Sequence, residues 1–125
     1  MTISYTIDLG QQTVFSTFTG HVTNAEIIAH QNELRSDPKF NPDMFELMDC
    51  IGEVSVDHIV ANVIGLVDRS PWGRVSRRAI IAPDPLIFGR SKIFQAYISH
   101  EHGNVSVFRG MNAARKWLYE GEGKS

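Results

Sequence analysis

The sequence predicts an α/β domain built on a mostly parallel sheet. From residue 13 onward, β-rich runs alternate with helical patterns, an order typical of parallel strands joined by helices. The central run, residues 45–50, is largely apolar and shows no polar alternation, which suits a strand covered on both faces. The first two β-rich runs are separated only by residues 10–12. That connection is too short for a parallel crossover, so we expect an antiparallel hairpin at the start.

The hairpin opens with a strand in which Ile3, Tyr5, Ile7 and Leu9 alternate with polar residues, the pattern of a half-buried strand. Residues 13–19 form its partner. The first helix then has a signal at each end. The run Thr23-Asn24-Ala25-Glu26 is a capping box, and Asp37-Pro38 ends the helix because proline disfavours helical geometry in the residue before it.

The central strand, residues 45–50, leads through a turn that contains Gly52 to a second helix. Ser55 suits the N-cap of that helix, and Asp57 would lie in its first turn, where the helix dipole favours negative charge. An apolar stripe continues to residue 67, and the helix ends at Arg69-Ser70-Pro71. The centre of the molecule is therefore a strand whose carboxyl end opens onto a helix N-terminus.

Two further strand–helix units complete the chain. Residues 79–82 and 105–108 are short β-type runs, and each precedes a helical pattern. Asp84 is the expected cap of the third helix, with Pro85 at its first position, and the last helix covers residues 111–119. We expect one domain over residues 1–125, with residues 121–125 as a frayed tail. Its order is β-β-α-β-α-β-α-β-α, with only the first of five strands antiparallel.

Composition restricts the classes of function. A chain of 125 residues with a formal charge of −2 is one ordinary globular domain with no electrostatic footprint for nucleic acid. Its single cysteine, Cys50, rules out an internal disulfide and fits a reducing compartment. The sequence shows no signal peptide and no apolar run of about 20 residues that could span a membrane. We expect a cytoplasmic protein without a membrane span.

The element order, the length and three local patterns resemble the SpoIIAA-like proteins, small bacterial domains of the STAS and SEC14-like class. The patterns are Gly20-His21-Val22-Thr23, Leu34-Arg35-Ser36-Asp37-Pro38-Lys39-Phe40, and Val107-Phe108-Arg109 before Ala114-Arg115-Lys116-Trp117-Leu118. The resemblance implies a single-domain SpoIIAA-like fold. It also implies a regulatory or ligand-binding module, since members of that class act in this way.

The resemblance also draws attention to Ser55. In anti-sigma-factor antagonists, a serine at the start of the helix after the central strand is phosphorylated, and Ser55 lies near that place. The family has an aspartate-serine-serine-glycine pattern there, whereas this chain reads Glu53-Val54-Ser55-Val56-Asp57. Phosphorylation would add a charge of roughly −1.5 to −2 and alter a docking edge. The alternative is a plain N-cap, and caps are far commoner than switches.

Other reactive residues have simpler interpretations. We expect the carboxylate of Asp49 to accept hydrogen bonds from neighbouring backbone amides, with orientation of His21 or His58 as the alternative. Cys50 has no CxxC partner, which argues against a catalytic thiol. His100 and His102 are two residues apart and would diverge on a helix, so we predict no tightly bound metal. No catalytic motif appears, and we expect no cofactor.

If the protein binds a small ligand, we expect the site at the carboxyl edge of the parallel strands, where helix N-termini converge. The residues predicted to form it are His21, Thr23, Gly52, Ser55, Asp84, Phe88 and Arg90. Under the competing interpretation, Thr23, Ser55 and Asp84 only cap their own helices.

Two functions follow from these patterns. The first is a non-catalytic regulatory or interaction module of the STAS type, acting on a protein partner or a small ligand. The alternative is a small-molecule or lipid-binding protein, which could be an enzyme, with a pocket at the carboxyl edge of the sheet. The helix over residues 86–98 carries more apolar side chains than one buried stripe needs. That surplus could line a cavity or form the interface of a homodimer, and we expect a dimer.

Overall fold

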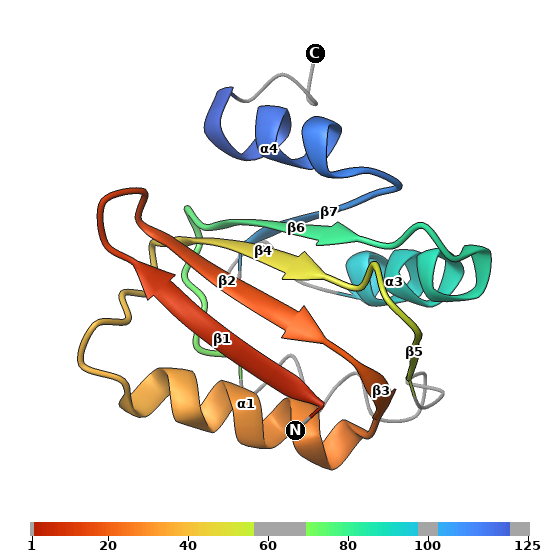
Figure 1. The fold of residues 1–125 in the computed structure, drawn as a ribbon. Coiled ribbons are helices and arrows are strands. Elements are labelled where there is room, and N and C mark those ends of the chain that lie inside the picture. The colour runs from red at the N-terminus through yellow and green to blue at the C-terminus, as the bar shows by residue number, and fades with distance from the viewer. Residues whose placement is uncertain (1, 57–69, 98–102, 121–125) are drawn as a thin grey trace.

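The computed structural model describes residues 2–56, 70–97 and 103–120. Its main sheet has five strands in the order β1-β2-β4-β6-β7, as Figure 1 shows. β1 pairs antiparallel with β2, whereas β2, β4, β6 and β7 are parallel to one another. The predicted mostly parallel sheet with an N-terminal antiparallel hairpin is therefore confirmed.

The strands lie close to their predicted positions. The hairpin consists of β1 (Ile3–Asp8) and β2 (Thr13–Phe18), joined at residues 9–12. The central strand is β4 (Phe45–Asp49), and β6 (Arg77–Ile81) and β7 (Asn104–Phe108) extend the sheet beyond it. β6 begins two residues earlier than predicted, so the sheet includes both Arg77 and Arg78.

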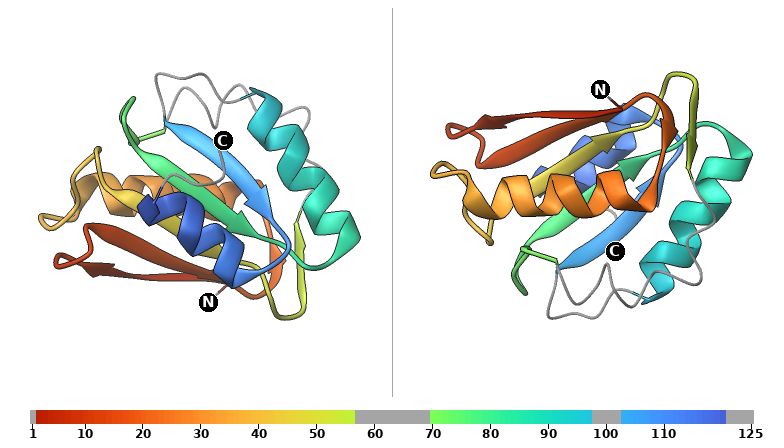
Figure 2. Two further views of the ribbon diagram at one scale, coloured as in Figure 1. Left: turned by 90° about the horizontal axis from the view of Figure 1, so that it is seen from above. Right: turned by 90° about the horizontal axis from the view of Figure 1, so that it is seen from below.

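Three helices are described, and they cover both faces of the sheet. α1 (Asn24–Ser36) and α3 (Pro85–Tyr97) lie on one face, and α4 (Met111–Glu120) lies on the other, as the two views of Figure 2 show. This arrangement explains why the middle of β4, residues 46–48, is buried on both faces. Residues 57–69, where the second helix is predicted, lie outside the described residues.

Two helix N-termini are capped as predicted. The side chain of Thr23 accepts a hydrogen bond from the backbone N–H of Glu26, and the Glu26 carboxylate accepts one from the backbone N–H of Thr23. At α3, Asp84 Oδ1 accepts hydrogen bonds from the backbone N–H groups of Leu86, at 2.8 Å, and Ile87, at 3.3 Å. Both carboxylates are favoured by the helix dipole as well.

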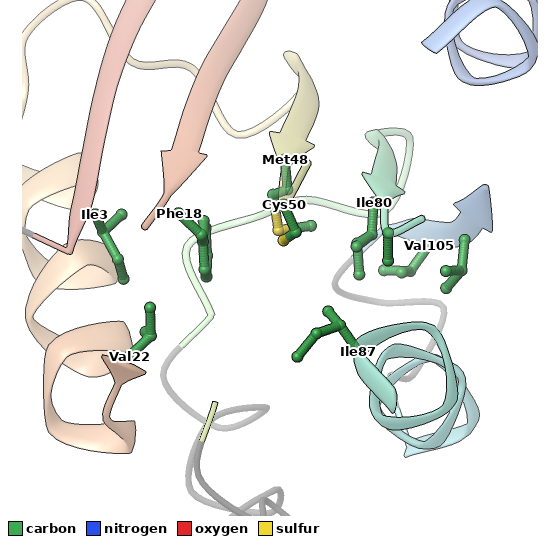
Figure 3. Close-up of a cluster of buried hydrophobic side chains, with 10 residues drawn as sticks. Ile3, Phe18, Val22, Met48, Cys50, Ile80, Ile87 and Val105 are labelled. Atoms are coloured by element: carbon green, nitrogen blue, oxygen red, sulfur yellow. The ribbon is translucent and has the colours of Figure 1, made fainter. Parts of the chain in front are cut away.

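The core divides into layers on either side of the sheet. On the α4 face, Leu47, Ala79 and Ile81 pack against Ala114, Trp117 and Leu118. On the opposite face, Figure 3 shows Met48, Cys50 and Ile80 facing Ile87 of α3. Alternation along β4 and β6 thus sends successive side chains to different layers.

The segment after β4 differs from the prediction. Ser55 does not cap a helix, because Val54–Val56 forms a short strand, β5. β5 pairs in parallel with β3 (Gly20–Val22), with His21 opposite Ser55. The sequence signal was misleading because serine suits an N-cap, while the valines on either side of Ser55 have high β propensity. This two-stranded ribbon is separate from the main sheet.

Among the described residues, no helix has both the length and the apolar character needed to cross a bilayer.

We predict that Thr23→Ala lowers the free energy of unfolding by about 1 kcal/mol, because it removes one half of the capping box. Urea unfolding followed by circular dichroism measures the change. Ser36→Ala, an exposed position in the last turn of the same helix, is the matched control and should change stability by less than about 0.5 kcal/mol. Equal effects of the two substitutions would show that the capping box contributes nothing.

Candidate functional site

A polar cluster lies inside the sheet face that α1 and α3 cover. Ser16, Glu46 and Arg78 come from the neighbouring strands β2, β4 and β6, and all three are buried. Glu46 and Arg78 are register partners across the β4–β6 pair. Strand pairing therefore places a carboxylate beside a guanidinium in the middle of an otherwise apolar layer.

Glu46 is the centre of this cluster. Its Oε1 accepts a hydrogen bond from Arg78 Nε at 3.0 Å, and its Oε2 accepts one from Ser16 Oγ at 3.0 Å. His30 of α1 places its Nε2 3.4 Å from Ser16 Oγ and 3.9 Å from Glu46 Oε2. The ring of Tyr5 packs edge-on against the His30 ring. Each oxygen of the buried carboxylate thus has a partner, as burial of a charge requires.

Opposing influences act on the pKa of Glu46. Burial is the largest and raises it, but the charge of Arg78, together with His30 and the Arg78 hydrogen bond, lowers it by more. The net effect holds the pKa of Glu46 below its ordinary value. Glu46 is therefore ionised at neutral pH and forms a true ion pair with Arg78.

Arg78 is only partly satisfied by this pair. The guanidinium carbon lies 5.1 Å from the centroid of the Trp72 ring and 5.9 Å from that of Phe94, contacts that favour a cation. Its Nη1 is buried and has no hydrogen-bond partner. An unsatisfied buried donor costs roughly 1–3 kcal/mol, so Arg78 has hydrogen-bonding capacity that the folded chain leaves unused.

Arg78 lines a cavity of about 80 Å³ between the sheet and the two helices α1 and α3. The wall is mainly apolar, and its polar groups come from the Glu46 cluster and from α1 and α3. The described residues that line it are Phe18, Ile27, His30, Gln31, Glu46, Met48, Cys50, Trp72, Arg78, Ile80, Ile87, Arg90, Ser91 and Phe94. Among them, Gln31 has a second buried polar atom without a partner, its side-chain Oε1.

Cys50 is the thiol in this wall. Burial, assisted by the negative charges of Asp49 and Glu46, raises the pKa of Cys50 to about 12. The thiol is therefore protonated at neutral pH, and a protonated thiol is a poor nucleophile. Cys50 acts here as a small apolar side chain.

Some predicted site residues have structural roles. Thr23 and Asp84 cap α1 and α3 with their side chains, as the competing interpretation expected. Asp49 Oδ1 accepts a hydrogen bond from the backbone N–H of Ile51 at 2.9 Å, which confirms the simpler interpretation of that carboxylate. Gly52 lies exposed in the turn before β5.

The remaining predicted residues fall into three places. His21 and Ser55 meet on the β3–β5 ribbon, where His21 Nδ1 and Ser55 Oγ are 2.8 Å apart and both residues are exposed. Phe88 packs against the apolar core, and the Arg109 guanidinium lies 4.6 Å from its ring centroid. Arg90 lines the cavity.

Sequence reasoning missed the Glu46–Arg78 pair. Arg77 and Arg78 appear as a basic pair before an apolar run, which suggests two surface cations. In a strand, however, successive side chains point to opposite faces. Arg77 lies on the α4 side, where its Nη1 donates to the carbonyl oxygens of Trp117 and Leu118 at 3.2 and 3.3 Å. Glu46 within a buried-type strand was the available signal, since it needs an internal partner.

Among residues 2–56, 70–97 and 103–120, no group of three or more His, Cys, Asp or Glu side chains could hold a metal ion. His100 and His102 lie outside these ranges, so the prediction made for them stays a prediction.

Comparisons with known proteins identify the fold. No family model matches the chain, and no curated protein matches it. It is similar to the solved structure, at 2.25 Å resolution, of an uncharacterised protein of the DUF3478 family with a SpoIIAA-like fold from Shewanella loihica PV-4. The two share 20% sequence identity over 93% of each chain, with a TM-score of 0.60. The chain has a SpoIIAA-like fold, as its sequence patterns predicted.

We predict that Glu46→Gln lowers the free energy of unfolding by about 3 kcal/mol or more at pH 7, because it leaves the buried Arg78 without its counter-charge. The pKa of Glu46 is lowered in the folded protein. Its ionic contribution is therefore fully present above the ordinary glutamate value of about 4.3 and is lost as pH falls through the lower folded value. The stability gap between parent and variant should narrow below about pH 4.3.

Urea unfolding at a series of pH values measures this gap directly. Other carboxylates whose pKa is lowered, such as Glu26 and Asp37, contribute equally to both proteins. Subtracting the free energy of unfolding of the variant from that of the parent therefore removes their contributions. Glu33→Gln, at an exposed position of α1, is the control and should change stability by less than about 0.5 kcal/mol. If the difference in free energy of unfolding between the parent and Glu46→Gln stays constant from pH 7 to pH 3, Glu46 is not the ionised partner of Arg78.

Proposed function

We propose that this protein is a non-catalytic binding module that holds a small, mainly apolar ligand between its sheet and helices α1 and α3. The observation that carries the proposal is the cavity whose apolar wall ends on Arg78, a buried cation with an unsatisfied Nη1. Ligand pockets usually combine an apolar lining with a few polar groups that fix orientation.

The energetics of the polar cluster support a binding role. A buried ion pair is often no more stabilising than apolar side chains of the same volume. The Glu46–Arg78 pair also leaves Nη1 without a partner, which costs further free energy. A ligand that accepts a hydrogen bond from this nitrogen would remove that cost. The cluster is therefore easier to explain as a binding site than as a stabilising device.

The chemistry of the wall favours binding over catalysis. The Cys50 thiol has a pKa of about 12, and the Ser16 hydroxyl donates its hydrogen to Glu46 within a buried cluster. An activated nucleophile needs both an adjacent base and access to a substrate carbonyl. The Cys50 thiol stays protonated, and Ser16, although bonded to Glu46, is buried and is not among the described residues that line the cavity.

The proposed pocket differs in place from the one expected at the carboxyl edge. Only Arg90 belongs to both. The reason is that α3 directs several of its apolar side chains toward the sheet. Ile87 is buried, and Phe94 is half-buried against the same core. Much of the surplus therefore faces the sheet and the cavity.

A regulatory role of the STAS type is the second candidate, and the exposed Ser55 hydroxyl favours it. Ser55 lies on the β3–β5 ribbon beside His21, so a protein partner or a kinase could reach it. Its phosphorylation is part of this second proposal. The homodimer and the cytoplasmic location also stay predictions. Leu86 of α3, which is 59% exposed, is the described apolar side chain of that helix most available to a second copy.

Filling the pocket tests the main proposal. Ser91 lines the cavity from α3, so Ser91→Leu should occupy much of it. Ala96→Leu places the same side chain at an exposed position of the same helix and is the matched control. Ligand-detected NMR with a library of small aliphatic fragments should find binders of the parent. We expect Ser91→Leu to weaken their binding at least about tenfold, and Ala96→Leu to leave it within about twofold.

The proposal fails if the parent binds no fragment at millimolar concentration. It also fails if Ser91→Leu, shown to be folded by its NMR spectrum, binds the same fragments as tightly as the parent.

A further inference from the structure

We propose that the ligand of this pocket is a short-chain monocarboxylate whose head group binds the free end of the Arg78 guanidinium. This inference rests on the proposed binding function and assigns the chemical class of the ligand. It follows from which donors of Arg78 are in use, from the charges of the wall and from the size of the cavity.

The guanidinium of Arg78 is held in place with part of its donor set unused. Only its Nε is bonded to Glu46, while Nη1 is buried without a partner. A guanidinium carries five N–H donors in a rigid planar fork, and the fork matches the two oxygens of a carboxylate. The rings of Trp72 and Phe94 lie beside it, and the Glu46 bond fixes its orientation. The group is thus ordered before any ligand arrives, which reduces the entropic cost of binding.

The charged groups of the wall are compatible with an anionic ligand. Among the described lining residues, Arg78 and Arg90 are cations, and Glu46, which is already paired with Arg78, is the anion. Gln31 also lines the cavity, and its side-chain Oε1 is buried without a partner. This oxygen is an acceptor, so the head group of the ligand is assigned to Arg78 and not to Gln31.

The rest of the cavity suits a short apolar chain. Apolar side chains of β2, β4, β6 and α3 form most of the wall. Its volume of about 80 Å³ is smaller than the roughly 150 Å³ of an engineered cavity that admits benzene. A long acyl chain would therefore need more room than this wall encloses, whereas a carboxylate of two to four carbons is no larger than benzene and is the size class proposed.

Three probes of matched length test the inference: propanoate, propanamide and 1-propanol. Each is smaller than benzene, as the cavity volume requires. Each is titrated into ¹⁵N-labelled protein at pH 7, and dissociation constants come from backbone shifts. We expect propanoate to bind at least about tenfold more tightly than propanamide, because its hydrogen bonds to arginine are charge-assisted. Resonances of the Arg78 side-chain N–H groups should shift with propanoate. Within a carboxylate series, affinity should rise about fourfold for each added methylene until the cavity is full.

The variant Arg78→Lys keeps a cation beside Glu46 but removes the planar fork. We expect it to reduce the preference for propanoate over propanamide at least about fivefold, while the affinity for 1-propanol stays within about twofold. A purely structural role for Arg78 would weaken all three probes alike. Arg90→Gln is the comparison variant at the other arginine of the wall.

The outcomes separate three failures. If 1-propanol binds the parent and propanoate binds no more tightly, the carboxylate assignment is wrong and the proposed pocket stands. If the preference depends on Arg90 and survives Arg78→Lys, the head-group position is wrong. If none of the three probes nor any other fragment binds, the proposed function fails as well. The comparison of probes on the parent protein applies even if Arg78→Lys does not fold.

Discussion

The ion pair between Glu46 and Arg78 lies in the middle of the main sheet, and the groups around it are arranged to satisfy it. Strand pairing makes the two residues register partners, and both are nearly inaccessible to solvent. An ionised carboxylate in such a place must be hydrogen-bonded on both oxygens. Ser16 from β2 and His30 from α1 lie within reach of the second oxygen. The positions of β2, β4, β6 and α1 are thus linked through one charged group.

The remaining layers complete the surroundings of this pair. Trp72 and Phe94 flank the guanidinium, and α3 brings Ile87 and Arg90 to the same cavity. On the other face, α4 packs on Leu47 and Ile81, so the strands that hold the pair are covered on both sides. The consequence is a sheet covered on both faces in which Arg78 lines a mainly apolar cavity and keeps a buried donor, Nη1, without a partner. That combination is the physical basis of the proposed binding role.

The fold was largely predictable from the sequence, and the pocket was not. Strands and helices can be predicted from local sequence patterns, such as the alternation of apolar and polar residues in residues 3–9 and the capping residues Thr23 and Asp84. The error at Ser55 arose where local signals conflict, since a good capping residue stands between two valines and the pairing of β5 with β3 decided the outcome. The pairing of Glu46 with Arg78 depends on strand order and register across 32 residues of sequence. No local pattern encodes that, although a carboxylate inside a buried-type strand does indicate that a partner exists.

The central claim is that this ion pair serves ligand binding and is not required for the stability of the fold. The most direct test is the free energy of unfolding of the double variant Glu46→Met/Arg78→Met, measured by urea unfolding at pH 7. Replacing both charges with apolar side chains of similar volume is often neutral or stabilising by about 1–4 kcal/mol, whereas removing one partner is strongly destabilising. We predict a double variant that is at least as stable as the parent. A loss of about 3 kcal/mol or more would show that the pair holds the fold together and would contradict the account.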